Sequence, residues 1–180
     1  MHYNIPSLKL FSWRDVCKSY SSIEIIELLE PQKVELMCVN CQRLIHATLF
    51  NCFQELILNV NLYTYPINEI NEIISNFRIN RNIDGETPAV KYWMKKKIII
   101  DYLFKGNCMG CGKMNTLNNL PSLEFHHKDP IIEEKIRWQK IKHLNIKTII
   151  KLLLEETCIC LCANCHKLEN SHQFAEFSIE

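Results

Sequence analysis

Apolar residues recur at helical spacing through the middle of the chain. Segment 47–63 places its apolar residues three or four positions apart, which predicts a helix: Leu49, Phe53, Leu56 and Val60. Residues 67–77 repeat this pattern and predict a second helix. Residues 81–88 are polar and end in proline, which predicts a turn before a third helix over 90–104.

The last third of the chain alternates short strand patterns with helical ones. Residues 122–126 predict a strand, and residues 158–161 predict a second short strand. Residues 146–156 and 163–174 each predict a helix. Glycine occurs only 4 times in 180 residues, so the pattern favours a mixed or mainly helical fold over an all-β one.

The N-terminal segment resembles the end of the chain. A shift of 124 residues aligns residues 1–46 with residues 125–170 at 11 identical positions, whereas about 3 are expected from typical residue frequencies. Eight of the 11 matches fall within residues 25–46. The chain therefore carries a partial internal repeat; chance similarity between two short cysteine motifs is the alternative.

The first copy differs from the second at the positions where chemistry is expected. Tyr3 lies opposite His127, and Gln42 lies opposite His166. No CxxC motif precedes Cys38, so this copy cannot complete a four-cysteine site by itself. We expect an inert copy that serves packing, or else a chain that belongs to a longer tandem protein.

The chain has 10 cysteines and neither a secretory signal nor an apolar run of membrane-spanning length. We therefore expect a cytoplasmic protein without a membrane partner, whose cysteines bind metal or are buried as thiols. Six cysteines form CxxC pairs, at positions 38/41, 108/111 and 162/165. The other four are expected to be buried thiols: Cys17, Cys52, Cys158 and Cys160.

Charge is distributed unevenly along the chain. Residues 1–90 carry 7 basic and 10 acidic residues, whereas residues 91–172 carry 14 basic and 8 acidic ones. The net positive charge thus lies on the half that holds two CxxC pairs, as a nucleic-acid partner would favour. Lysines of the predicted third helix could contact phosphates; a solvated helix face is the alternative.

Two CxxC pairs in the C-terminal half match a structural zinc site. Thiolates of Cys108, Cys111, Cys162 and Cys165 suit tetrahedral Zn²⁺. The 50 residues between the pairs exceed what a simple zinc ribbon needs. We therefore expect them to form a folded insertion that contains other functional residues.

Histidines suggest a second, open metal site. His166 and Asn170 are four residues apart, so their side chains leave one face of a helix. His126 and His127 are adjacent on a strand and point to opposite faces, so only one of them can join that helix face. The other is available as a base near neutral pH.

Residues 123–130 (LEFHHKDP) and 158–170 (CICLCANCHKLEN) together resemble the HNH endonucleases of the ββα-metal superfamily, in their zinc-braced form. The resemblance covers about residues 101–172. It implies an α+β fold: a small ββα-metal domain braced by a four-cysteine zinc site, with a mainly helical N-terminal region. The implied boundaries are 1–46 for a degenerate partial HNH-like repeat, 47–100 for a helical connector and 101–180 for the nuclease domain.

The resemblance implies hydrolysis of DNA phosphodiester bonds. His127 would be the general base, while His126, His166 and Asn170 would bind Mg²⁺ or another catalytic divalent cation beside the structural Zn²⁺. The central asparagine of the family, which orients the base, falls at Thr157, whose hydroxyl would have to serve instead.

DNA contacts are expected from four lysines: Lys95, Lys96, Lys97 and Lys128. The alternative is a catalytically weak or inactive zinc-containing module that binds nucleic acid. Oligomeric state stays open.

Overall fold

The computed structural model of the chain describes residues 2–3, 18–32, 34–35, 37–59, 65–79, 86–127, 129 and 136–171. The fold combines helices with two small antiparallel two-stranded sheets. The elements of the first half are β1 (His2–Tyr3), α2 (Ser22–Leu29), η2 (Glu30–Gln32), β2 (Val34–Glu35), α3 (Val39–Ile45), α4 (Thr48–Cys52), α5 (Gln54–Leu58) and α6 (Ile67–Asn76). Those of the second half are α7 (Glu86–Phe104), α8 (Thr116–Asn119), η3 (Leu120–Ser122), β3 (Leu123–His126), α10 (Trp138–Ile141), α11 (Ile146–Glu155), β4 (Ile159–Cys162) and α12 (Ala163–Glu169).

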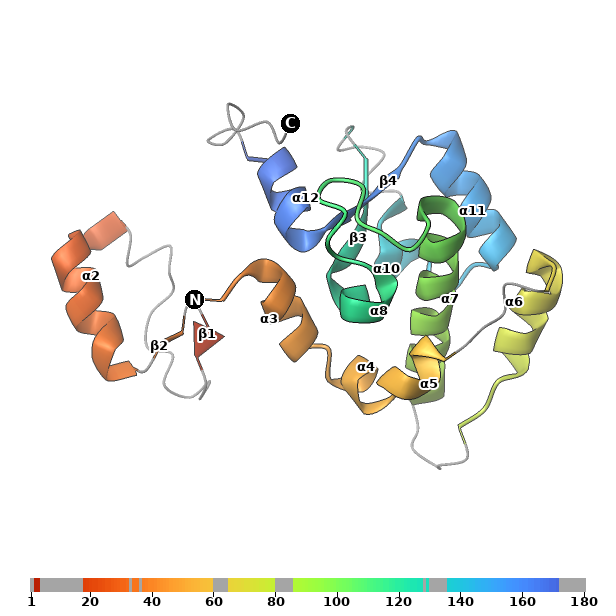
Figure 1. Cartoon of the computed structure of the whole chain (residues 1–180), viewed down its shortest axis with the longest axis horizontal. Coiled ribbons are helices and arrows are strands. Elements are labelled where there is room, and N and C mark those ends of the chain that lie inside the picture. The colour runs from red at the N-terminus through yellow and green to blue at the C-terminus, as the bar shows by residue number, and fades with distance from the viewer. Residues whose placement is uncertain are drawn as a thin grey trace.

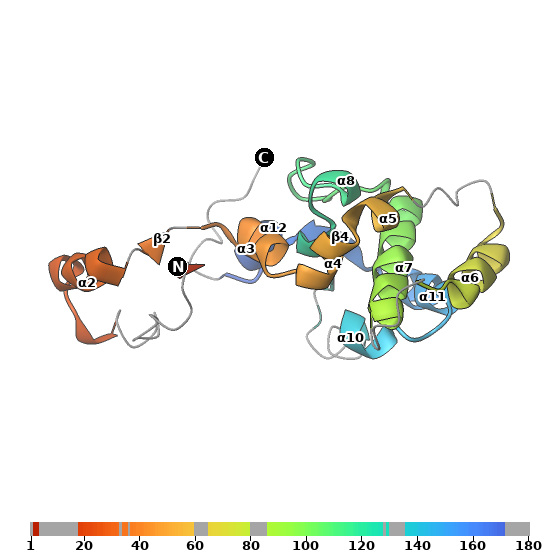
Figure 2. The same cartoon turned by 90° about the horizontal axis from the view of Figure 1, so that it is seen from below.

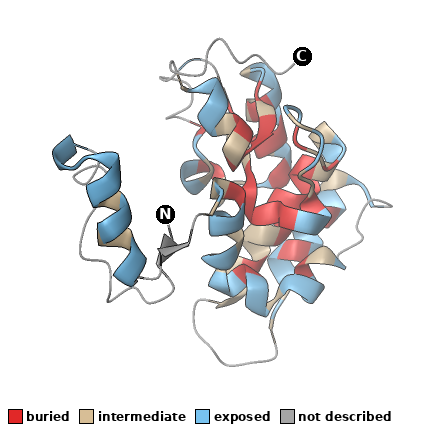
Figure 3. Ribbon diagram, turned by 60° about the vertical axis from the view of Figure 1, so that its left-hand side comes forward, coloured by how far each residue is buried: buried red, intermediate tan, exposed pale blue. Residues whose placement is uncertain are grey.

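Helix α7 lies at the centre of the main body, with α4 and α5 on one side and α11 on another (Figures 1 and 2). It begins at Glu86, four residues before the predicted start, because Pro88 falls in the first turn, where a missing N–H costs no hydrogen bond. Its residues 94–100 are all buried, and Figure 3 shows that buried residues gather where the elements of the main body pack together.

The other predicted helices agree with the structure except over 47–63 and at the end of the last helix. Segment 47–63 forms two short helices, α4 and α5, instead of one, because the chain leaves helical geometry at Phe53. Helix α11 begins where Asn145 accepts a hydrogen bond from the Thr148 amide at 2.8 Å. Its apolar face is buried over Ile146, Ile149, Ile150 and Leu153.

Strands β3 and β4 and helix α12 form a ββα unit in the C-terminal half. The strands pair antiparallel from Leu123 opposite Cys162 to His126 opposite Ile159. The chain then passes from β4 into α12 without a loop. Helix α12 ends at Glu169, so the helix predicted over 163–174 is too long: Asn170 lies in a turn and Ser171 is not helical, and residues 172–174 lie outside the described residues.

The same order of elements occurs 124 residues earlier. Strand β1 pairs with β2 through His2 opposite Glu35, which is the His126–Ile159 register shifted by 124. Helix α3 spans the residues equivalent to α12. Helix α2, equivalent to the first part of α11, buries no residue and lies apart from the main body in Figure 1.

Candidate metal centres

The loop after α7 and the start of α12 bring four cysteines together. The Sγ atoms of Cys108, Cys111, Cys162 and Cys165 all lie within 4.8 Å of one another, and most of this cluster is buried. Space at Gly110 is tight: a Cβ there would lie 3.0 Å from the Cys165 Sγ, so that neighbour would have to move by a few tenths of an ångström. The predicted four-cysteine site therefore exists as a cluster that could bind a metal such as zinc.

Hydrogen-bond donors surround these sulfurs. The Cys162 amide donates to Cys108 Sγ at 3.1 Å, and Asn40 Nδ2 donates to Cys162 Sγ at 3.3 Å. Burial works against ionisation of Cys111, yet backbone N–H groups of Met114 and Lys113 bring its pKa down to about 7. Burial raises the pKa of Cys162 and Cys165, so a bound cation would be needed to hold all four sulfurs as thiolates.

A second cluster lies on the face of the β3–β4 sheet that α12 covers. Glu124 and His126 alternate on β3, so both side chains leave the same face. The rings of His126 and His166 meet edge to face with centroids 4.8 Å apart. His126 is only 1% exposed. The ββα unit thus brings together two of the three residues expected to bind the catalytic ion.

A carboxylate links this cluster to the N-terminal half. Glu124 Oε2 lies 2.6 Å from His166 Nδ1, and Glu124 Oε1 forms an ion pair with Arg43 at 2.8 Å. Burial raises the pKa of Glu124, but the hydrogen bond from His166 and the charge of Arg43 outweigh it and lower that pKa. A carboxylate on Nδ1 orients the ring of His166 and leaves Nε2 to face a metal.

The expected catalytic pair lies at one end of the sheet. His127 follows β3 directly, is half-buried, and accepts a hydrogen bond at Nδ1 from the Asp129 amide at 2.8 Å. Thr157 is exposed in the turn before β4 and has a φ of 50°. The His126–Ile159 register places both residues just beyond the last strand pair.

Asn170 takes a different position from the other expected ligands. It follows α12, is exposed, and its amide donates to the His166 carbonyl at 3.2 Å. It lines a surface depression together with Cys38 and Asn164, whereas His166 lines another cavity. Asn170 as a ligand of the catalytic ion therefore stays a prediction.

A cavity of about 400 Å³ opens beside Glu124 and His166. Its lining combines cations with aromatic rings: Arg43, Lys96, Arg137, Trp93, Phe125 and Trp138. A neighbouring depression of about 610 Å³ shares Arg43, Trp93, Pro121 and Gln139 with it, so the two adjoin and are together called the groove below. Sequence reasoning missed these residues, which lie on elements far apart in the chain and carry no motif.

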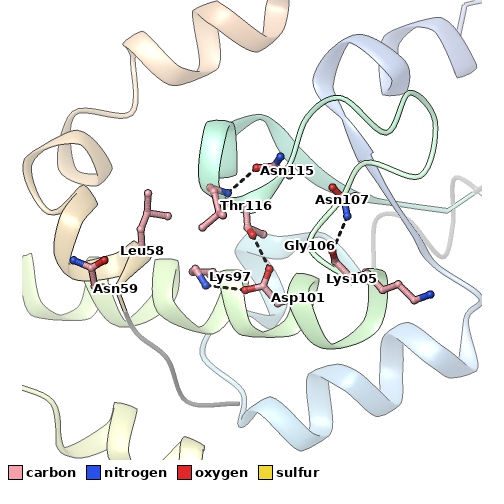
Figure 4. Close-up of a pocket in the computed structure, with 10 residues that line it drawn as sticks. Leu58, Asn59, Lys97, Asp101, Lys105, Gly106, Asn107, Asn115 and Thr116 are labelled. Atoms are coloured by element: carbon pink, nitrogen blue, oxygen red, sulfur yellow. Dashed lines mark hydrogen bonds and ion pairs between the residues drawn. The ribbon is translucent and has the colours of Figure 1, made fainter. Parts of the chain in front are cut away.

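Three of the lysines expected to contact DNA are buried, so that prediction is wrong for them. Lys95 donates to the Leu144 carbonyl at 2.8 Å. Lys97 pairs with Asp101 at 2.8 Å beneath a surface depression (Figure 4). Lys96 stacks on the Trp93 ring, and burial lowers its pKa to about 8. Lys128 lies outside the described residues.

The first copy does more than pack against the second. Its helix α3 contacts α12, and Arg43 on α3 reaches Glu124. The equivalent asparagines of the two copies exchange hydrogen bonds: Asn40 N to Asn164 Oδ1 at 3.3 Å, and Asn164 N to Asn40 Oδ1 at 3.0 Å. The repeated segments thus meet around a local two-fold axis.

Comparison with family models, with curated proteins and with solved structures gives no match. Within the described part of the chain, every helix is too short or too polar to cross a bilayer.

Proposed function

We propose that this chain is a metal-dependent endonuclease of the HNH type, which hydrolyses DNA phosphodiester bonds. The observation that carries the proposal is the ββα unit whose strand histidine and helix histidine meet, with Glu124 fixing the helix histidine. A four-cysteine cluster directly beneath this unit supports it, because Cys162 and Cys165 also begin the helix that carries His166.

His126 and His166 would hold the catalytic cation. A divalent ion such as Mg²⁺ bound there would offset the charge of the scissile phosphate and stabilise the leaving oxygen. Two imidazoles also suit transition metals, so activity should be tested with several divalent ions. Asn170, which lines a neighbouring depression, is the third candidate ligand.

His127 would take the proton from the attacking water. Its Nδ1 accepts a hydrogen bond from the Asp129 amide. This bond has to break, and the attacking water has to donate to Nδ1 in its place, before Nδ1 can act as a base. Arg43 and Arg137 in the adjoining groove would bind phosphates, and Trp93 and Trp138 offer surfaces for base stacking.

The test is cleavage of supercoiled plasmid with Mg²⁺, Mn²⁺ or Ni²⁺ by the wild type and by His127→Ala. We expect the variant to lose about 10²-fold or more in rate, as for removal of a general base. His143→Ala, which removes an exposed histidine, is the control and should cleave normally.

Equal cleavage by His127→Ala and the wild type would discard the assigned base. Salt-sensitive DNA binding without cleavage under every ion would favour the alternative, a non-catalytic zinc-containing module.

A further inference from the structure

Cys38 and Cys41 form a second, separate pair of thiols. Their Sγ atoms lie 3.3 Å apart, and both residues are exposed. Neither belongs to the buried cluster around Cys162. The site proposed for DNA cleavage does not use them, so any role of this pair is independent of that function.

The pair has the local structure of the metal-binding pair in the second copy. Cys38 precedes α3 as Cys162 precedes α12, both with extended backbone at the cysteine. Asn40 Nδ2 donates to Cys162 Sγ, and the Asn164 side chain donates to Cys38 in return. The local two-fold axis thus gives Cys38 the same amide donor as a residue of the four-cysteine cluster.

These donors favour a thiolate at Cys38. The Cys41 amide donates to Cys38 Sγ at 3.4 Å, and the Asn164 side chain adds a second donor. A neutral thiol or a disulfide sulfur is a weak acceptor and would gain little from such donors, whereas a metal-bound thiolate would gain much. Sulfurs on one tetrahedral zinc ion lie roughly 3.8 Å apart, so the pair needs to open only slightly.

Two thiolates fill half of a tetrahedral zinc site. Among the described residues, the cluster around Cys162 is the only group of three or more His, Cys, Asp or Glu that could hold a metal, so no third such ligand there completes the pair. Because both sulfurs are exposed, a second chain can approach them, and a two-fold axis through the metal supplies two identical thiolates.

We propose that Cys38 and Cys41 of two copies of this chain bind one zinc ion, which joins the copies as a dimer. The ion is coordinated by four thiolates, and its removal separates the chains without disturbing the buried cluster.

The test combines zinc content with molar mass for the full-length chain, kept reduced and supplied with Zn²⁺ alone. The wild type should sediment as a dimer and hold about half a zinc ion per chain more than Cys38→Ser and Cys41→Ser, which should sediment as monomers. Zinc bound by the four-cysteine cluster or by His126 and His166 contributes equally to all these proteins. The control is Cys52→Ser, because Cys52 is exposed and not buried as the sequence predicted; this variant should remain dimeric with the zinc content of the wild type.

Three results would overturn the proposal. The first is a Cys38→Ser variant that stays dimeric with unchanged zinc content. The second is a monomeric wild type that holds one zinc ion per chain more than Cys38→Ser, which would mean completion within one chain. The third is a monomeric wild type with the zinc content of Cys38→Ser whose mass, without reductant, is about 2 Da lower, which would identify a Cys38–Cys41 disulfide.

Discussion

At the residue scale, Lys96 is a charged side chain buried in the protein interior, which costs stability. It is 5% exposed, and burial lowers its pKa to about 8. The nearby carboxylate of Glu124 acts in the opposite direction but does not outweigh burial. A shift from about 10.4 corresponds to on the order of 3 kcal/mol of destabilisation while the lysine stays charged.

Lys96→Met should therefore raise the free energy of unfolding at pH 7, by about 1–3 kcal/mol. In the wild type this penalty is fully present below pH 8 and disappears as pH rises from about 8 to about 10.4, because only the unfolded state still binds the proton there. Chemical denaturation at pH 7 and pH 10 measures both effects. Lys147→Met, an exposed control, should change neither. A stability gain equal at both pH values would contradict the assignment.

Thr157 is a β-branched residue in left-handed backbone geometry, with a φ of 50°. Asparagine and glycine adopt this geometry more readily, so Thr157→Asn and Thr157→Gly should each stabilise the protein by about 1 kcal/mol. Thr157→Val keeps the branched side chain and should show no such gain. The measurement is thermal unfolding of the wild type and the three variants. A Thr157→Asn protein less stable than the wild type would show that the backbone at Thr157 is not strained.

At the element scale, the contact between α3 and β3 gives a direct role to the N-terminal copy. The side chain of Arg43 is 55% exposed, yet it forms an ion pair with Glu124. The carboxylate of Glu124 in turn bonds to Nδ1 of His166. Besides the contact with phosphate proposed above, Arg43 is therefore a positioning residue for the proposed site, and part of the effect of its loss should act through the carboxylate.

Arg43→Ala should lower the plasmid cleavage rate by about tenfold, within the range typical of groups that orient metal ligands. Without Arg43 the pKa of Glu124 rises, so the acid limb of the pH–rate profile should move to higher pH. Arg43→Lys should recover part of the rate, and Arg78→Ala, which removes another exposed arginine, should match the wild type. An unchanged pH profile in Arg43→Ala would show that Arg43 does not act through Glu124.

Sequence patterns predicted the local elements well and the long-range contacts poorly. The CxxC spacing was sufficient for the four-cysteine cluster, and alternation along residues 122–126 was sufficient to expect one histidine to face the final helix. The lysines of α7 were misjudged because helices pack around that helix on several sides, which its own periodicity does not reveal. The Arg43–Glu124 pair joins residues that no local pattern connects.

At the scale of the whole molecule, two related segments meet at their cysteine motifs. The equivalent residues Asn40 and Asn164 bond to each other, and each also supports a sulfur of the opposite copy. One copy carries the buried cluster and the histidines, while the other supplies Arg43 and an exposed thiol pair. The excess of basic residues after residue 90 includes three buried lysines, so the positive charge available to DNA is smaller than the count suggests.

Locating both metals in crystals tests the central claim most directly. Crystals grown with zinc and soaked in Mn²⁺, which stands in for Mg²⁺, should show a zinc peak within the Cys108–Cys165 cluster and a separate manganese peak between His126 and His166. Anomalous scattering at the two absorption edges distinguishes the ions. Manganese found only elsewhere, or histidine rings that bind no ion at any soak concentration, would contradict the nuclease account.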